Sequence, residues 1–238
     1  RFAVAAAILT PAFFAGFTTS QTDLWIHNGL QRSVEVQVGE ETFRIFGGDH
    51  ITSEMDADDT TIATRTLEGE VIESFEVDLD DYDQPVYSVA GAASFARWWA
   101  VYGNLPEMDM EFENERVFDA DADYVFQQPP EQISSRHATR KSVLEPLEPG
   151  ALRQLLGDAE VTRQARVHQQ WDPDDAPYLS FWLMGLPEAE REPAMRARFE
   201  RAPSGRTWLI WSRMASPEAV EARCANAAPP FVAAVCSK

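Results

Sequence analysis

Short stretches in which apolar and polar residues alternate run from residue 24 to residue 89, and they constrain the fold more than any other feature of the sequence. The apolar positions are Leu24 and Ile26, Val34, Val36 and Val38, Phe43 and Ile45, and Val71, Phe75 and Val77. Because successive side chains of a β-strand point to opposite faces, this alternation predicts strands that bury one face. Turn signals such as Asn28-Gly29 and Gly47-Gly48 separate the stretches. Short strands at this spacing predict an antiparallel, immunoglobulin-like β-sandwich over residues 22–103.

The pattern becomes helical after Pro149. Apolar residues then recur at three- and four-residue steps, as in Leu179, Trp182, Leu183 and Leu186, which predicts amphipathic helices. We therefore expect an α+β chain of several modules, in which an acidic connector with short strands (104–148) joins the sandwich to a helical module of short hairpins (149–238). A helical-repeat solenoid is the alternative for the last part, although no fixed period is present.

The chain opens with an uncharged and almost wholly apolar run, Phe2 to Phe17. At about 1.5 Å per residue, such a helix reaches roughly 24 Å, close to the thickness of a thin bilayer. We expect a transmembrane or signal-anchor helix over residues 1–21, and hence a single-pass bacterial membrane protein with its body on the extracytoplasmic side. A cleaved signal peptide is the alternative. Because the sequence starts at Arg1 and not at a methionine, two alternatives stay open: an initiator region was lost, or this is the tail of a longer polypeptide.

Acidic residues are concentrated in the first half of the chain. From residue 22 to residue 135 there are 26 Asp and Glu against 5 Arg, whereas from residue 136 to residue 238 there are 13 against 14 Arg and Lys. A strongly negative surface repels phosphate backbones, so the charge argues against nucleic acid as a partner. A solvated, solubilising surface is the simplest interpretation of this charge.

Two cysteines, Cys224 and Cys236, lie close together near the end of the chain. In an exported protein, an isolated pair of this kind predicts one disulfide. Such a bond would contribute on the order of 3 kcal/mol by constraining the unfolded chain. The spacing is not C-x-x-C and no histidine is near, so a metal site or a redox pair is the weaker alternative.

No catalytic or cofactor motif occurs. The four histidines show no H-E-x-x-H spacing, and G-x-S-x-G, G-x-x-x-x-G-K-[ST] and G-x-G-x-x-G are all missing from the sequence. We therefore predict no catalytic residue, no cofactor and no enzyme activity in this chain.

Clustered aspartates offer one alternative site. Asp78, Asp80, Asp81 and Asp83 follow a strand candidate, and they could turn several carboxylates toward one Ca²⁺. A second, alternating set consists of Asp119, Asp121 and Asp123. Neither set has the glycine and glutamate that an EF-hand loop requires, so the expected metal content is none, with calcium as the minor alternative.

Seven tryptophans are many for this length. Large aromatic residues are enriched in recognition surfaces, but they more often fill cores and domain contacts. Trp208 and Trp211 lie three residues apart and share one face of a helix, which favours core packing. The Trp98-Trp99 pair belongs to a stretch, residues 91–102, that we expect to dock the sandwich.

Residues 24–103 resemble the sandwich-like extracytoplasmic domains of some large bacterial membrane proteins, including certain membrane-bound zinc metallopeptidases of the zincin class. The resemblance rests on Asn28-Gly29, on the Val34-Val36-Val38-Gly39 strand and turn, and on the Tyr87 to Ala93 stretch. It implies that any catalytic part lies upstream of Arg1 or in another subunit, and no active-site residue is carried over.

The function expected from these features is that of a non-catalytic, membrane-anchored extracytoplasmic protein. It would be an accessory or partner-binding part of a bacterial membrane complex, with protein partners and with the membrane contacted through Phe2 to Phe17. The alternative is the C-terminal regulatory tail of a membrane-bound enzyme, such as a metallopeptidase whose active site is outside this chain. A sandwich that binds glycan or calcium at the cell surface is a third possibility.

Overall fold

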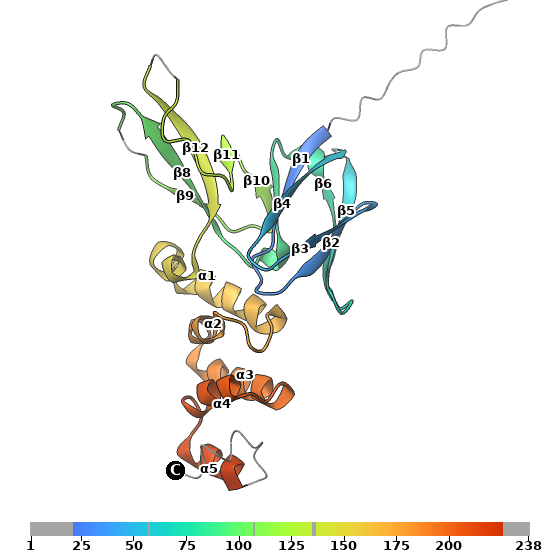
Figure 1. Ribbon diagram of the computed structural model, residues 1–238, viewed down its shortest axis with the longest axis vertical. Helices are drawn as coiled ribbons and strands as arrows, with labels where there is room; N and C mark the ends of the chain where they lie inside the picture. The colour runs from blue at the N-terminus through green and yellow to red at the C-terminus, as the bar shows by residue number, and fades with distance from the viewer. Residues whose placement is uncertain (1–20, 57, 107, 135–136, 226–238) are drawn as a thin grey trace, which may run out of the picture.

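The computed structural model describes residues 21–225 except residues 57, 107, 135 and 136. Strands gather at one end of the molecule, and the helices continue away from them as a column (Figure 1). The strands are β1 (Gln21–His27), β2 (Val34–Val38), β3 (Glu41–Ile45), β4 (His50–Asp56), β5 (Asp59–Thr66), β6 (Val71–Asp78), β7 (Pro85–Ser88), β8 (Phe95–Tyr102), β9 (Glu111–Glu113), β10 (Val117–Asp119), β11 (Tyr124–Val125) and β12 (Thr139–Pro146). The helices are α1 (Pro149–Trp171), α2 (Leu179–Gly185), α3 (Glu188–Arg201), α4 (Gly205–Ser212) and α5 (Pro217–Ala225), with short turns η1 (Leu79–Asp81) and η2 (Val89–Gly91).

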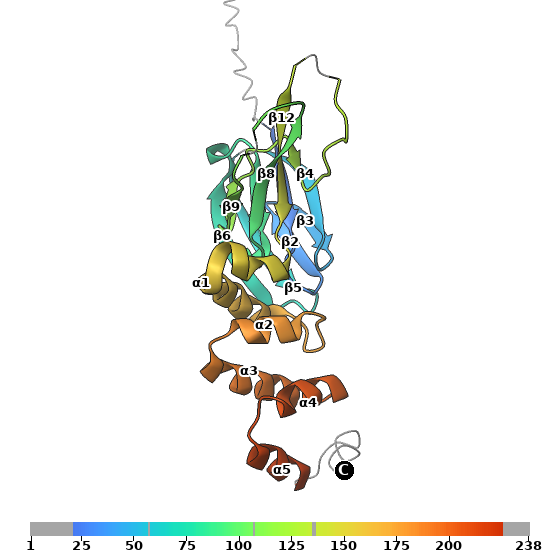
Figure 2. The same cartoon turned by 90° about the vertical axis from the view of Figure 1, so that its left-hand side faces the viewer.

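The strands form three four-stranded sheets. We call β10-β7-β1-β4 the central sheet, β3-β2-β5-β6 the sandwich sheet and β11-β12-β8-β9 the arm sheet. Most neighbouring strands are antiparallel, but β1 pairs with β7 and β11 pairs with β12 in parallel. Long strands β8 and β12 pair from Phe95 opposite Pro146 to Tyr102 opposite Thr139, and they build the arm that projects beside the central sheet (Figure 2).

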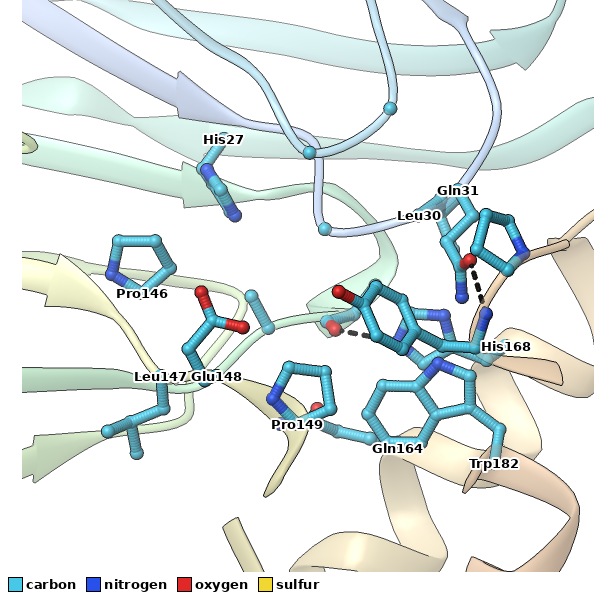
Figure 3. Close-up of a pocket in the computed structure, with 17 residues that line it drawn as sticks. His27, Leu30, Gln31, Pro146, Leu147, Glu148, Pro149, Gln164, His168 and Trp182 are labelled. Carbon is cyan, nitrogen blue, oxygen red and sulfur yellow. Dashed lines mark hydrogen bonds between the residues drawn. The ribbon is translucent and has the colours of Figure 1, made fainter. Parts of the chain in front are cut away.

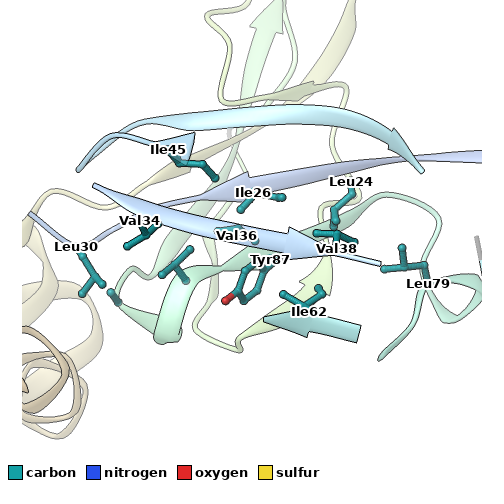
Figure 4. Packing of buried hydrophobic residues seen from close by; sticks show 12 residues of the cluster. Leu24, Ile26, Leu30, Val34, Val36, Val38, Ile45, Ile62, Leu79 and Tyr87 are labelled. Carbon is teal, nitrogen blue, oxygen red and sulfur yellow. The ribbon is translucent and has the colours of Figure 1, made fainter. Parts of the chain in front are cut away.

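The central and sandwich sheets face each other across an apolar core (Figure 4). Val34, Val36 and Val38 of β2 are fully buried, and the residues between them are exposed. This confirms the alternation predicted for that strand. The buried members of this core are Leu24, Ile26, Leu30, Val34, Val36, Val38, Ile45, Ile62, Leu79, Tyr87, Val89 and Ala92.

The central sheet is buried on its other face as well. There a second core gathers Val86, Ala93, Phe95, Phe118, Ala120, Ala122, Val125 and Leu144 from the central and arm sheets and the loops beside them. Strand β1 therefore buries Leu24 and Ile26 on one face, while Trp25 packs against the second core. On that side the ring centroid of His27 lies 5.4 Å from that of Phe95. The burial of His27 follows from this position in a strand that is covered on both faces.

The helices build a separate core of their own. Helix α1 is interrupted at Gly157, whose φ of 82° is not helical. Residues from all of α1 to α4 pack together, and Phe199 stacks on Trp211 with ring centroids 5.6 Å apart. Trp182, Trp208 and Trp211 are buried in this cluster, which confirms the expectation that these tryptophans fill a core.

Arg198 of α3 ties the end of α1 to the next layer of helices. Its side chain is 2% exposed, and its Nη2 donates to the carbonyl oxygens of His168 (3.0 Å) and Gln169 (2.9 Å). Its Nη1 donates to the carbonyl of Pro173 (2.9 Å). Because the last carbonyls of a helix have no partner within the helix, a cation at this position satisfies them and complements the helix dipole.

The predicted fold class is wrong in its arrangement of strands. Pairing is not purely antiparallel, and strands from the segment expected to be a connector complete two of the sheets: β10 joins the central sheet, and β9, β11 and β12 join the arm sheet. The physical reason is that the central sheet has two apolar faces, and Phe118, Val125 and Leu144 of this segment cover the second one. The predicted domain boundaries themselves stay a prediction.

The predicted membrane helix is also corrected. Between residues 21 and 225, none of the described helices is long and apolar enough to span a bilayer. The longest of them, α1, carries charged side chains such as Arg153, Asp158 and Arg166. Of the predicted helix 1–21, including Phe2 to Phe17, residues 1–20 lie outside the described residues, and Gln21 begins strand β1. A single-pass membrane protein is therefore not supported.

The predicted disulfide has one end in the described part of the chain, where Cys224 is disulfide-bonded. Cys224 belongs to α5 and packs against the helical core, but Cys236 lies outside the described residues. The pairing of Cys224 with Cys236 therefore stays a prediction.

Candidate functional site

A cavity of about 370 Å³ lies where the central sheet meets helices α1 and α2 (Figure 3). We call it the junction cavity. Its polar and aromatic lining comes from His27, Glu148, Gln164, His168, Tyr178 and Trp182. Small-molecule sites typically occupy about 300–1,000 Å³ and lie at contacts between modules, lined by apolar groups and a few polar ones. The junction cavity has this size and this position.

Two tight loops form the wall on the side of the sheet. The side chain of Asn28 donates to the carbonyl oxygens of Arg32 (2.8 Å) and Phe46 (3.0 Å), which holds the two loops together. A Cβ atom on Gly29 would lie 2.9 Å from the backbone of Ala92, so only glycine permits this close approach. The turn signals Asn28-Gly29 and Gly47-Gly48 therefore do more than separate strands, because they shape the cavity.

His27 is the most unusual polar group of the lining. His27 is 4% exposed, and neither of its ring nitrogens has a hydrogen-bond partner among the described residues. Nδ1 is fully buried, whereas Nε2 is not, and Figure 3 shows the far end of the ring directed toward the cavity. Burial, and secondarily the nearby imidazole of His50, lowers the pKa of His27 to about 4. The ring is therefore neutral at neutral pH.

His168, by contrast, is held at both ring nitrogens. Nε2 donates to the carbonyl of Ala92 (3.0 Å), and Nδ1 is hydrogen-bonded to the carboxylate of Asp172 (2.8 Å). The ring stacks on Trp182 with centroids 3.9 Å apart. Asp172 also accepts from the backbone N–H of Gln31 (2.8 Å) and from its side-chain amide (3.2 Å). These contacts fasten the end of α1 to two loops of the central sheet.

A second group of hydrogen bonds fastens the middle of α1. Gln164 Nε2 donates to Ser94 Oγ (2.6 Å) and to Glu160 Oε1 (3.0 Å), and Arg163 Nη1 donates to the carbonyl of Gly91 (2.8 Å). Burial raises the pKa of the Glu160 carboxyl, but hydrogen bonds from Arg163, Ser94 and Gln164 outweigh it and the pKa is lowered overall. Of residues 91–102, expected to dock the sandwich, Gly91 to Ser94 contact α1, whereas Phe95–Tyr102 form strand β8 of the arm sheet.

The mouth of the cavity carries the only carboxylate of the described lining, that of Glu148. This residue is exposed and occupies the N-cap position of α1 without a side-chain capping hydrogen bond. Its carboxylate projects into the space between Pro146, Pro149 and His27 (Figure 3). No Lys or Arg occurs among the described lining residues. The cavity therefore combines apolar walls, one carboxylate and no cationic side chain with one open donor, the indole N–H of Trp182.

The aspartates singled out as a possible calcium site lie elsewhere, around η1. The carboxylate of Asp78 accepts from the backbone N–H of Asp80 (3.0 Å) and so caps that turn. The backbone N–H of Asp83 donates to Asp119 (3.1 Å), which brings the two aspartate sets together. Over the described ranges, no group of three or more His, Cys, Asp or Glu side chains is arranged to hold a metal ion. Calcium binding by Asp78, Asp80, Asp81 and Asp83 gains no support from this arrangement.

Sequence reasoning named Asn28-Gly29, Gly47-Gly48 and Trp182 only as turns and as part of a helix, and it did not bring the lining residues together as a site. One usable signal existed: His168 and Asp172 are four residues apart, and residues at this spacing share one face of a helix. His27 gave no comparable signal, because a residue that alternates with apolar neighbours is normally on the solvent face of a strand.

No protein family, curated protein or solved structure matches this chain. The resemblance of residues 24–103 to sandwich-like extracytoplasmic domains therefore stays a prediction, and the site is interpreted from its own geometry.

Proposed function

We propose that this chain is a binding protein that holds a small organic ligand in the junction cavity and does not transform it. The observation that carries the proposal is His27, whose buried imidazole lines the cavity without a protein partner at either nitrogen among the described residues. An unsatisfied buried polar group destabilises a protein by about 1–3 kcal/mol, and the great majority find a partner. Nδ1 is the fully buried nitrogen, whereas Nε2 is not fully buried and is free to bond to a ligand in the cavity.

The other polar groups of the cavity support binding over catalysis. Both nitrogens of His168 are engaged, so this imidazole has no free position at which to take a proton from a ligand. The described lining contains no Ser, Thr, Cys or Lys that would act as a nucleophile. The proposal keeps the non-catalytic character expected from the sequence, but it places a small organic ligand where the sequence led us to expect protein partners.

The test uses a cavity-filling variant. Pro146 lies at the mouth of the cavity and is exposed, so Pro146→Trp fills the entrance without replacing a core side chain. Its matched control is Glu76→Trp, on an exposed position of β6. The probes are 2-phenylethylamine, 2-phenylethanol and 3-phenylpropionate, which share one ring and differ in charge, each titrated to about 10 mM because ligands of this size bind weakly.

Amide chemical shifts in NMR spectra are the measurement. We expect at least one probe to shift signals of residues that line the cavity, in the unmodified chain and in Glu76→Trp but not in Pro146→Trp. Binding of none of the three probes, or equal binding to Pro146→Trp, would contradict the proposal.

A further inference from the structure

Resting on the proposed function, we infer that the ligand of the junction cavity is a small organic amine, held as its ammonium ion, with an apolar body. The inference follows from which hydrogen-bonding positions in the cavity remain open and from which charges are missing from its walls.

Two of the open positions are strong acceptors, and the indole N–H of Trp182, buried without a hydrogen-bond partner among the described residues, is an open donor. The Glu148 carboxylate projects into the cavity and caps no backbone N–H of α1. Both bonds of the Gln164 amide nitrogen go to Ser94 and Glu160, and since a carboxylate only accepts, this fixes the amide orientation and leaves the Gln164 carbonyl oxygen free. An ammonium group has three donors and no acceptor, and it matches these two acceptors.

Anionic ligands lack a counterpart here. Phosphate and carboxylate groups are normally held by Arg, Lys or several backbone N–H groups, and the described lining has neither cation. The N-terminus of α1 would attract an anion through the helix dipole, but the negative charge of the N-cap residue Glu148 opposes this, and Pro149 at the first helical position has no N–H to donate. The whole chain has a formal net charge of −19, which attracts cations and repels anions.

The walls suit an apolar body. Leu30, Pro149 and Trp182 line the cavity, and Tyr178 contributes a half-exposed aromatic ring. A cation near an aromatic face is stabilised by the ring quadrupole. His27 adds a neutral imidazole, whose Nε2 accepts a hydrogen bond when the ring proton is on Nδ1. The cavity thus offers acceptors for the charged end and apolar surface for the remainder.

The charge-matched probes introduced above test the inference. We expect 2-phenylethylamine to bind about tenfold more tightly than 2-phenylethanol or 3-phenylpropionate, because a hydrogen bond to a charged group is worth roughly this factor. Glu148→Gln keeps the shape of the side chain and removes its charge. We expect this substitution to weaken binding of the amine about tenfold and to leave binding of the alcohol unchanged. Glu145→Gln, which removes the same charge from a residue outside the lining, is expected to change neither by more than about twofold.

Outcomes separate the inference from the proposed function. If the alcohol or the propionate binds in the cavity as tightly as the amine, or if Glu148→Gln binds the amine unchanged, the inference is overturned while the binding function stands. If no probe binds, the proposed function itself fails. Nα-acetyl-lysine methylamide serves as a further arm: binding tighter than that of the phenyl amine would assign the ammonium to a partner's lysine side chain and overturn the inference of a small free amine, whereas weaker binding would support it.

Discussion

The sandwich core and the junction with α1 are held together by different forces. Between the central and sandwich sheets, eleven of the twelve buried residues are aliphatic, and the exception, Tyr87, places its hydroxyl 2.6 Å from both Thr64 and Glu73. Between the central sheet and α1, hydrogen bonds to Asp172, His168 and Glu160 accompany the apolar contacts of Val167 and Trp171, and an open cavity lies among them.

This difference separates folding from function in the molecule. Apolar burial is non-directional and contains no group that titrates near neutral pH, so the core should resist changes in pH and salt. Buried polar networks fix a specific geometry and depend on protonation. We therefore expect the core to set the stability of the chain, and the junction to set the position of the helices and the sensitivity to acid.

The largest effect is expected in the core. Ile26 of β1 is fully buried between the two sheets, and Ile26→Ala removes its methyl groups and leaves a void. We expect the free energy of unfolding to fall by about 4 kcal/mol. Chemical denaturation at pH 7 and at pH 5 measures it, and the loss should be equal at the two values. A loss that differs strongly between the two pH values would contradict the contrast between core and junction. The control is Glu35→Ala on the exposed face of β2, which should change the free energy of unfolding little.

Acid is expected to weaken the junction through His27. Its pKa is about 4 in the folded chain, against 6.5 for an unperturbed histidine, so the unfolded chain binds more protons between these values. Stability is therefore full above pH 6.5 and falls as the pH decreases, by about 3 kcal/mol at pH 4. Denaturation curves from pH 7 to pH 4 measure the loss. His27→Phe, which cannot titrate, should lose about 3 kcal/mol less than the unmodified chain over this range, and parallel curves would refute the assignment.

A smaller effect is expected from the hydrogen bonds that fasten α1. Asp172→Asn replaces one carboxylate oxygen, an acceptor, by an amide N–H donor that faces His168 or Gln31. We expect the free energy of unfolding to fall by about 2 kcal/mol. Hydrogen exchange should show faster exchange in α1 with unchanged protection in β2 and β5. The matched control is Asp175→Asn, an exposed position in the same loop. Equal loss of protection in the sandwich strands would mean that the two regions are not energetically distinct.

The alternation of apolar and polar residues correctly predicted the strands that are buried on one face only. Glu35 and Gln37 interrupt the valines of β2, and that alternation is a direct consequence of strand geometry. The same pattern misled for β1, where Leu24 and Ile26 alternate with Trp25 and His27, because both sets are buried against different sheets. Burial of the second face of β1 depends on residues far along the chain, such as Phe126, and the local pattern of β1 does not predict it.

The candidate site could not be predicted from local sequence patterns for a similar reason. Its walls come from the loop after β1, the end of β12 and helices α1 and α2, which are distant in sequence. Strands of two or three residues, such as β9 and β11, are too short to show a period. Register across β8 and β12 is likewise a non-local property. The apolar start of the chain led to a membrane helix by composition alone, and no described helix has that character.

The most direct test of the junction cavity as a binding site is ¹⁵N NMR of the histidine side chains during a titration with 2-phenylethylamine. The account predicts a saturable shift of the Nε2 signal of His27 in the unmodified chain, with little change for the hydrogen-bonded ring of His168 and no shift in Pro146→Trp. An unchanged His27 signal at saturating amine, with shifts confined to other parts of the chain, would contradict it.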